Sequence, residues 1–421
     1  MIAGTPSSLI NWSGSHRYRA GELHRPETVE ELRAVVTGAR GTLQVLNTRH
    51  TFTAIGDADG LLSLDRLAGA HAVEIDTSVQ TTTVGAAVTY AELAGALNAH
   101  GFALANLASL PHISVAGAIS TATHGSGSRL GNLATSVRGL KLITGEGDPL
   151  ALGPEDPRLQ GAAVHLGALG VVTEVTLAIE PYYELRQDVY LGLGWDALGV
   201  HFEDVMSAGR SVSVFHDFGE RTREVWIKGD PDREVPRELF GAVPAHEPHN
   251  PVPGGQPENC TAQLGSRGPW SERLPHFRSG FTPSSGKEIQ SEWFVAREDA
   301  VAAIQALRPL APRIREWLQI AELRVIAADE LWMSPHQGRE SAALHFTWRL
   351  EPDPVARVCS EIERALAPMA ARPHWGKLFS PGPLPWRPER LADFLALRGE
   401  LDPSGRFANP WLRDRVPNMV A

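Results

Sequence analysis

The sequence predicts an α+β protein with two domains, and three observations lead to this fold class. The chain has 421 residues, which is longer than one hydrophobic core usually supports. Residues 23–180 alternate between helix-like and strand-like patterns. The segments after Pro181 are longer and richer in tryptophan. We therefore expect a domain boundary near residue 180.

Capping and alternation signals predict the elements of the first half. The segment Thr28–Glu31 is a capping box that begins a helix, and Gly41 is expected to end it. The segment Thr89–Glu92 begins a second helix in the same way, and Gly101 ends it. Short runs of apolar or β-branched residues predict strands at 43–46, 61–64, 73–75, 81–88, 140–144 and 170–177. Gly85, inside the fourth run, predicts a bulge or a close approach of another segment.

The second half is expected to contain fewer and longer elements. Helical spacing covers residues 298–307 and 354–366, and strand-like patterns cover 322–327 and 342–349. Residues 229–286 are rich in proline, glycine and histidine and are expected to form long ordered loops.

Composition and charge exclude several classes of protein. Apolar residues make up 43% and charged residues 21% of the chain, which is the mixture of a soluble globular protein. The net charge of −10, without a block dense in lysine or arginine, argues against nucleic-acid and anionic-membrane partners. No apolar run approaches the roughly 20 residues of a membrane helix. The first residues lack a signal-peptide pattern, so the cytoplasm is the expected location.

The sequence patterns for disulfide frameworks, metal sites and common nucleotide-binding loops are incomplete in this chain. Cys260 and Cys359 are too few for a disulfide framework or a four-thiolate zinc site, so we expect buried free thiols. Pro248 separates His246 from His249 and no further ligand is evident, so no metal site is predicted. The glycines from Gly125 miss the G-x-G-x-x-G spacing, and 280–287 misses a P-loop. Both failures weaken a two-domain, non-flavin nucleotide-binding interpretation.

Two segments have the character of a cofactor site. Residues 105–127 are almost all small or hydroxylated from Ser114 onward, which lets backbone N–H groups approach a large anion. A small-residue segment packed in a core explains the same pattern equally well. Thr48–Thr51 forms a polar turn after a buried strand, where ligand-binding turns often lie. Taken singly, His50 in such a turn is more often a surface residue.

Together these segments resemble the vanillyl-alcohol-oxidase superfamily of flavoproteins, and within it the alditol (xylitol) oxidases. The combination of motifs in this order is specific, although each motif alone is weak. The matching segments run along almost the whole chain and are Asn11–Gly14, Thr48–Phe52, 109–127, Gly167–Thr173, Pro373–Lys377 and 402–409.

The resemblance implies a two-domain FAD-binding fold and FAD attached covalently to His50. It implies an FAD-binding domain over 1–180, a substrate or cap domain over 181–375, and a C-terminal segment, 376–421, that returns to the first domain. Asn47 stands where the family usually has glycine, and asparagine tolerates the left-handed backbone that such a turn needs. The residues assigned to the cofactor are Asn47, Thr48, Arg49, His50, Thr51, Ser109, Ser114, Gly117, Thr121, Ala122, Thr123, His124, Val172 and His374.

The resemblance also implies substrate residues that suit a polyol. They are Ser109, Glu322, Arg324, Thr347 and Lys377, with Glu322, Arg324 and Lys377 as the catalytic set. Glu322 can accept hydrogen bonds from hydroxyls, while the two cations can favour alkoxide character as a hydride leaves carbon. Without the resemblance, an exposed ion pair and a solvated lysine would explain these residues. The proton acceptor stays open, with His345 and His374 as candidates.

The expected reaction is oxidation of a terminal hydroxyl of an alditol, such as xylitol or sorbitol, to the aldose, with O2 reduced to H2O2. A sugar-lactone oxidase or dehydrogenase on the same scaffold is the nearest alternative. A flavin-binding protein without turnover is the alternative from another class, and the joint presence of Glu322, Arg324 and Lys377 argues against it. Ala108, beside Ser109, is expected to leave room for O2 near the flavin.

Overall fold

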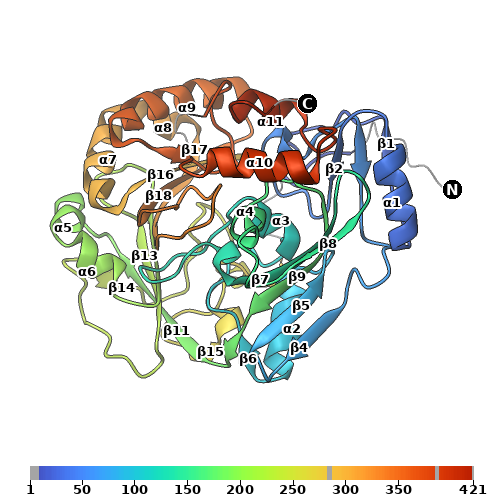
Figure 1. Cartoon of the computed structure of the whole chain (residues 1–421). Helices are drawn as coiled ribbons and strands as arrows, with labels where there is room; N and C mark the ends of the chain where they lie inside the picture. The colour runs from blue at the N-terminus through green and yellow to red at the C-terminus, as the bar shows by residue number, and fades with distance from the viewer. Residues whose placement is uncertain (1–8, 282–286, 385–387, 420–421) are drawn as a thin grey trace.

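Four sheets organise the part of the chain that the computed structural model describes, residues 9–281, 287–384 and 388–419 (Figure 1). A parallel three-stranded sheet has the order β1 (Glu22–His24), β3 (Gly60–Leu62), β2 (Leu43–Val45). An antiparallel five-stranded sheet has the order β4 (Val73–Asp76), β5 (Thr81–Gly85), β9 (Val171–Ala178), β7 (Val137–Ile143), β8 (Pro149–Leu152). A short pair joins β10 (Glu180–Pro181) to β6 (Phe102–Ala103).

A nine-stranded antiparallel sheet carries the second half of the described chain. Its order is β14 (Val243–Pro244), β11 (Glu184–Leu191), β13 (Glu224–Gly229), β12 (Ser211–His216), β17 (Leu318–Ile326), β18 (Ser341–Arg349), β16 (Glu288–Ala296), β19 (Arg372–Pro373), with β15 (Gly268–Pro269) pairing with β11. The strands predicted at 322–327 and 342–349 are thus neighbours, β17 and β18, at the centre of this sheet.

The first two helices test the capping predictions. α1 (Val29–Gly38) begins after Thr28, whose hydroxyl accepts the Glu31 N–H, but the Glu31 carboxylate accepts the N–H of Glu27. The predicted box is therefore only half formed, and the helix ends before Gly41. α2 (Tyr90–Ala99) has the complete capping box.

Three helices lie against the large sheet, as Figure 1 shows: α7 (Ala300–Leu307), α8 (Ala311–Trp317) and α9 (Pro352–Leu366). The second half also contains α5 (Trp195–Val200) and α6 (Phe202–Met206). The first half contains α3 (Val115–Ser120) and α4 (Leu159–Ala163), and the chain closes with α10 (Leu391–Leu401) and α11 (Pro410–Arg415).

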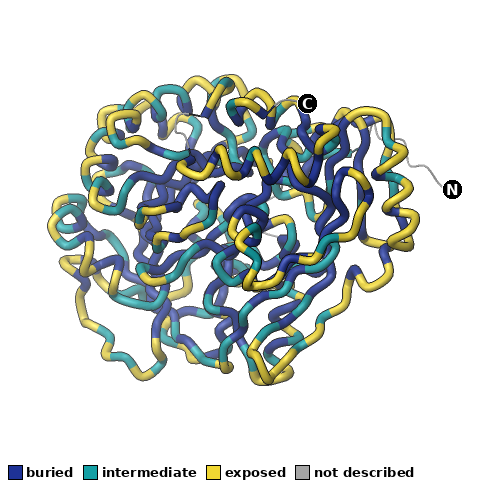
Figure 2. The backbone as a smooth tube through the Cα atoms, in the orientation of Figure 1, coloured by how far each residue is buried: buried dark blue, intermediate teal, exposed yellow. Residues whose placement is uncertain are grey.

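Apolar side chains form two large cores. Figure 2 shows the buried backbone of the interior in dark blue. The first core joins residues from 55–185 to apolar side chains of α10 and α11, so the chain's last helices pack with its first half. The second lies between the large sheet and α7, α8 and α9. The boundaries at residues 180 and 375 remain a prediction.

Close contacts join the small-residue segment to the rest of the fold. A Cβ added at Gly85 would lie 2.1 Å from the Gly69 carbonyl oxygen, which is the close approach that the sequence predicts. The Gly127 N–H donates to the Val325 carbonyl at 2.9 Å, and this bond fastens the segment to β17 of the large sheet. Cys260 and Cys359 are buried and free, as expected. Within the described ranges, no helix has both the length and the apolar character needed to cross a membrane.

Candidate active site

A cavity of about 620 Å³ lies between the first half of the chain and the large sheet. One wall is the turn 47–51, another is the small-residue segment around 114–123, and a third is the polar face of β16, β17 and β18. Most residues assigned to cofactor and substrate from the sequence line this cavity. They are Asn47, Thr48, Arg49, His50, Thr51, Ser109, Ser114, Gly117, Thr121, Thr123, His124, Val172, Glu322, Arg324, Thr347, His374 and Lys377. Ala122, by contrast, is fully buried beneath the wall.

The turn 47–51 is held by the N-terminal segment and by its own side chains. The residue with a left-handed backbone in this turn is Arg49, with φ of 58°. The expectation that Asn47 takes this conformation is therefore wrong. The Asn47 side-chain amide instead donates to the Ala86 carbonyl at 2.9 Å. Asn11 donates to the Thr51 carbonyl at 2.8 Å and closes the other end of the turn.

His50 is presented by this turn as a neutral imidazole. Its ring stacks on Trp12, with 5.0 Å between the ring centroids and 23° between the planes. Burial lowers the pKa of His50 to about 4. Its Nδ1 atom is buried and makes no hydrogen bond within the described structure. The ring lines the cavity, and a neutral imidazole has a nitrogen lone pair that can form a bond to a ligand.

The small-residue segment gives the cavity a wall without bulky side chains. Its members Ser114, Gly117, Thr121 and Thr123 carry at most a hydroxyl or methyl group, and Thr48 Oγ1 accepts the Ser114 N–H at 3.3 Å. A Cβ at Gly117 would come within 2.7 Å of the Ser114 hydroxyl oxygen. The glycine therefore leaves space and backbone polar groups where a large ligand can approach.

Glu292 on β16 is the centre of a buried charge cluster at the far end of the cavity. Arg324 Nη2 donates to Oε1 of Glu292 at 2.7 Å, and Lys377 Nζ donates to Oε2 at 2.7 Å. His124 Nε2 lies 3.3 Å from Oε1. Burial would raise the pKa of Glu292, but Lys377 and Arg324 outweigh it and hold the pKa well below its usual value. The carboxylate therefore stays charged and anchors both cations.

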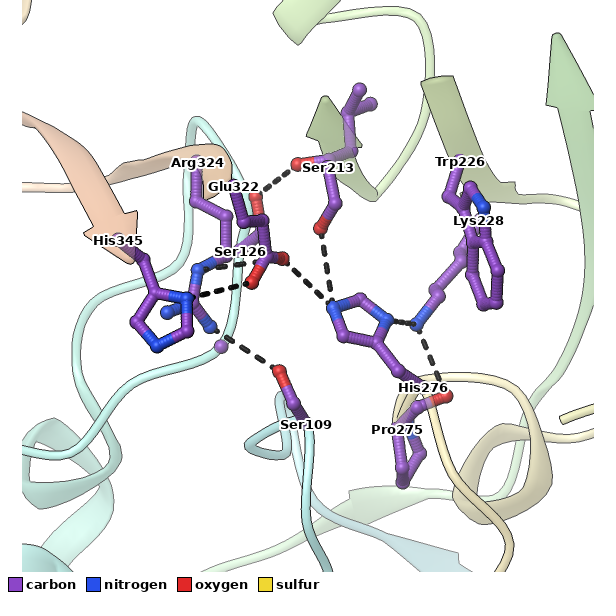
Figure 3. A network of polar contacts seen from close by, with 12 residues as sticks. Ser109, Ser126, Ser213, Trp226, Lys228, Pro275, His276, Glu322, Arg324 and His345 are labelled. Carbon is purple, nitrogen blue, oxygen red and sulfur yellow. Dashed lines mark hydrogen bonds and ion pairs between the residues drawn. The ribbon is translucent and has the colours of Figure 1, made fainter. Parts of the chain in front are cut away.

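Glu322 on β17 is the second buried carboxylate of the site. Its oxygens lie 3.5 Å from Arg324 Nε, 2.8 Å from His276 Nε2 and 3.8 Å from His345 Nδ1 (Figure 3). Burial opposes ionisation, but the charge of Arg324 and the contact with His276 hold the pKa of Glu322 far below its ordinary value. An ionised carboxylate at a cavity wall is a strong hydrogen-bond acceptor.

The other residues assigned to the substrate surround these charges. The Ser109 hydroxyl accepts from Arg324 Nη1 at 3.4 Å. Thr347 is buried on β18 and lies opposite Gln290 in the register with β16. His374 Nδ1 accepts the Gly376 N–H at 3.0 Å, so its remaining ring nitrogen is the one that can act in the site. The structure therefore brings together all five of the predicted substrate residues.

Sequence reasoning missed Glu292, Gln290 and His276. The signal for the first two was present, because Glu288, Gln290 and Glu292 alternate along one strand and so share a face. Only the strand register shows that this face lines the cavity. It sets Glu292 opposite His345, and His345 opposite Glu322. His276 lies in a long loop, where no periodicity could reveal it.

His124, Glu292 and His374 could in principle hold a metal ion, since their ligand atoms lie within 4.8 Å of one another. Two cations already occupy the same carboxylate, Arg324 and Lys377, each at 2.7 Å. Their positive charge repels a metal ion and neutralises the group that would bind it. The cluster therefore has the character of an anion-stabilising site.

Two family models match the chain. The model described as "FAD binding domain" matches residues 22–153, and the model described as "D-arabinono-1,4-lactone oxidase" matches residues 282–415. The turn 47–51 and the small-residue segment lie in the first match, and the charge cluster on β16, β17 and Lys377 lies in the second.

Several proteins resemble this chain over nearly its whole length. The alditol oxidase of Streptomyces sp. is 46% identical over 97% of this chain and 99% of that protein. The L-gulono-1,4-lactone dehydrogenase of Mycobacterium tuberculosis is 27% identical, covering 96% of this chain and 97% of that protein. The L-gulonolactone oxidase of Bos taurus is 25% identical, covering 96% of each.

Solved structures of cholesterol oxidases share the fold. A solvent-stable cholesterol oxidase matches with a TM-score of 0.76 at 14% identity over 97% of both chains. The cholesterol oxidase of B. sterolicum matches with a TM-score of 0.75 at 16% identity, over 98% of this chain and 97% of that one. At these identities the likeness concerns the fold alone. Together with the match to the FAD-binding domain model, it confirms the predicted FAD-binding fold of mixed helix and sheet with a second domain.

Proposed function

This chain belongs to the alditol oxidase family of FAD-dependent flavoproteins, and from that premise we propose that it oxidises a terminal hydroxyl of an alditol, such as xylitol or sorbitol, to the aldose, with O2 reduced to H2O2. The observation that carries the proposal is the set of charged residues on the cavity wall, in which Glu292, Glu322 and Arg324 are buried and Lys377 is partly buried. A polyol has a donor and an acceptor on each carbon and suits such a lining.

The wall residues fit an FAD. The small side chains from Ser114 to Thr123 leave room for a pyrophosphate, and His50 offers a buried ring nitrogen that makes no hydrogen bond within the described structure. We infer that His50 carries the flavin covalently. When bound, FAD supplies the redox chemistry by accepting the hydride from the substrate carbon.

The protein's own residues bind and polarise the reacting alcohol. Glu322 accepts a hydrogen bond from a hydroxyl, and the Ser109 and Thr347 hydroxyls set the position of the polyol along the wall. Arg324 and Lys377 stabilise negative charge that develops on the reacting oxygen, and burial strengthens this effect because little water screens it. Glu292 holds both cations in place, and its two oxygens accept hydrogen bonds from them rather than from the substrate.

Anaerobic flavin reduction by a panel of alcohols tests the proposal. Xylitol and sorbitol should reduce the flavin much faster than benzyl alcohol, because a substrate without hydroxyls leaves buried polar groups unpaired at about 1–3 kcal/mol each. Peroxide should then form when air is admitted. Faster reduction by a γ-lactone than by any alditol would support the sugar-lactone alternative instead.

A further inference from the structure

Two more ionisable side chains, His276 and Lys228, continue the hydrogen-bond network from Glu322. His276, in the loop between β15 and β16, lies between Glu322 and Lys228 of β13, as Figure 3 shows. We propose that Lys228 and His276 are positioning residues that keep Glu322 in place as an ionised hydrogen-bond acceptor, with the proton of the His276 ring on Nε2. This proposal rests on the proposed function in one respect, that Glu322 receives a substrate hydroxyl.

The contacts of Lys228 leave two proton arrangements. Its Nζ atom donates to the carbonyl oxygens of Leu274 and Pro275 and lies 2.9 Å from Nδ1 of His276. An ammonium group donates to all three atoms, whereas a neutral amine would donate to the two carbonyls and accept a hydrogen bond from Nδ1–H. The ammonium form places the imidazole proton on Nε2, 2.8 Å from Oε1 of Glu322.

The opposite arrangement is excluded by the charge of Glu322. With the proton on Nδ1 of His276, the lone pair of Nε2 would face Oε1 of Glu322 at 2.8 Å, and only a protonated carboxyl could fill that contact. Arg324 holds the pKa of Glu322 far below its ordinary value despite burial, so the carboxyl carries no proton at neutral pH. Lys228, His276 and Glu322 therefore have one consistent proton arrangement.

Packing holds the His276 ring in one orientation. The His276 ring meets Trp226 and Phe215 edge to face, with centroids 5.5 and 5.2 Å away, so it has little freedom to turn. The His276 backbone N–H donates to the Ser109 carbonyl at 3.2 Å, which ties the same loop to a second substrate residue. Lys228 is only 1% exposed.

Burial also sets the charges of the two residues. It lowers the pKa of His276 to about 4, so the ring is neutral and carries one proton. It lowers the pKa of Lys228 to about 7. Glu322 and Cys260 oppose this shift, and Arg324 adds to it. At pH 6 Lys228 is therefore an ammonium group.

The proton position can be observed directly. Nitrogen-15 NMR of the flavin-loaded protein, labelled on histidine and recorded at pH 6, distinguishes a protonated Nε2 from a protonated Nδ1. The His276 signals are identified by their loss in His276→Gln. We expect a protonated Nε2 in the native protein, and in Lys228→Met as well, because Glu322 still accepts this proton. A protonated Nδ1 in the native protein would overturn the proposal, and this result does not depend on turnover.

A matched pair of variants tests the consequence for the reaction. Glutamine at position 276 can place an N–H where Nε2 lies, whereas asparagine reaches only the Nδ1 position. We expect His276→Gln to keep the rate of flavin reduction by xylitol within about threefold, and His276→Asn and Lys228→Met to lower it about tenfold or more, the loss of roughly one buried hydrogen bond. His216→Gln, another buried histidine but packed on Trp195 and Phe218, is the control.

Equal losses in His276→Gln and His276→Asn would show that the ring matters only for packing and would contradict the positioning role. If the native protein is not reduced by any polyol, the proposed function fails, while the NMR result still decides the proton arrangement. The two failures are therefore distinguishable.

Discussion

At the scale of single residues, the site depends on one carboxylate that no motif pointed to. Glu292 is fully buried and holds Arg324 and Lys377, each at 2.7 Å. Such an arrangement stabilises the protein only while it is complete, because a buried charge without its partner is costly. The cations that we assign to the substrate are thus also part of what stabilises the fold.

Replacing Glu292 by glutamine should therefore destabilise the protein. The side chain keeps its size, but Lys377 loses the carboxylate that it contacts and Arg324 keeps only Glu322, so we expect a loss of roughly 3 kcal/mol in the free energy of unfolding. Urea denaturation of the purified protein measures it. Glu298→Gln, an exposed position after the same strand, should stay within about 0.5 kcal/mol of the native protein. A stable Glu292→Gln variant would show that the cations do not need this partner.

The proposed covalent attachment of the cofactor also depends on one residue. We expect His50→Ala to bind FAD only non-covalently, because the ring nitrogen that would form the bond is gone. Acid precipitation followed by the absorption spectrum of pellet and supernatant measures this. The native protein should keep its yellow colour in the pellet, as should His71→Ala, whose histidine is exposed on the surface. Flavin that stays attached in His50→Ala would refute the assignment.

At the scale of elements, the sequence revealed what is local and missed what depends on pairing. Glu322 and Arg324 could be placed on one face because they lie two apart on a single strand. Glu292 joins them only through the register of β16 on β18 and β18 on β17, which no local pattern encodes. Similarly, the turn 47–51 was found from its polar residues, but the partner of Asn47 is the carbonyl of Ala86, far along the chain.

The segment before the small-residue wall carries a prediction about oxygen. Ala108 is buried, lines the cavity and precedes Ser109, and the family resemblance places this segment against the flavin ring. A larger side chain in Ala108→Val should slow flavin reoxidation by O2 while flavin reduction by xylitol is little changed. Stopped-flow measurement of the two half-reactions separates these effects, with Ala108→Ser as a control of similar size. An unchanged oxidative half-reaction in Ala108→Val would rule out a gating role.

At the scale of the whole molecule, the described structure buries many histidines as neutral rings. Burial lowers the pKa of eight of them, which are His50, His124, His165, His216, His276, His336, His345 and His374. Their ordinary value of about 6.5 is recovered when the chain unfolds. The unfolded chain therefore binds more protons than the folded protein at mildly acidic pH.

Stability should consequently fall as the pH is lowered from 7 to 5. A histidine whose pKa is depressed in the folded state contributes its full stability above about 6.5 and loses it as the pH falls toward its folded value. The depressed pKa values of Glu292 and Glu322 act only below about 4.5. Buried carboxyls with raised pKa values, such as Asp329 at about 6, act in the opposite direction in this window, but the eight histidines outnumber them. His216, whose pKa burial lowers to about 4, should account for roughly 2 kcal/mol of the loss between pH 7 and 5. Urea denaturation at both pH values should show a smaller drop in His216→Gln by about that amount, and an unchanged drop in His71→Gln. A free energy of unfolding that is flat between pH 7 and 5 would mean that these rings are protonated in the folded protein.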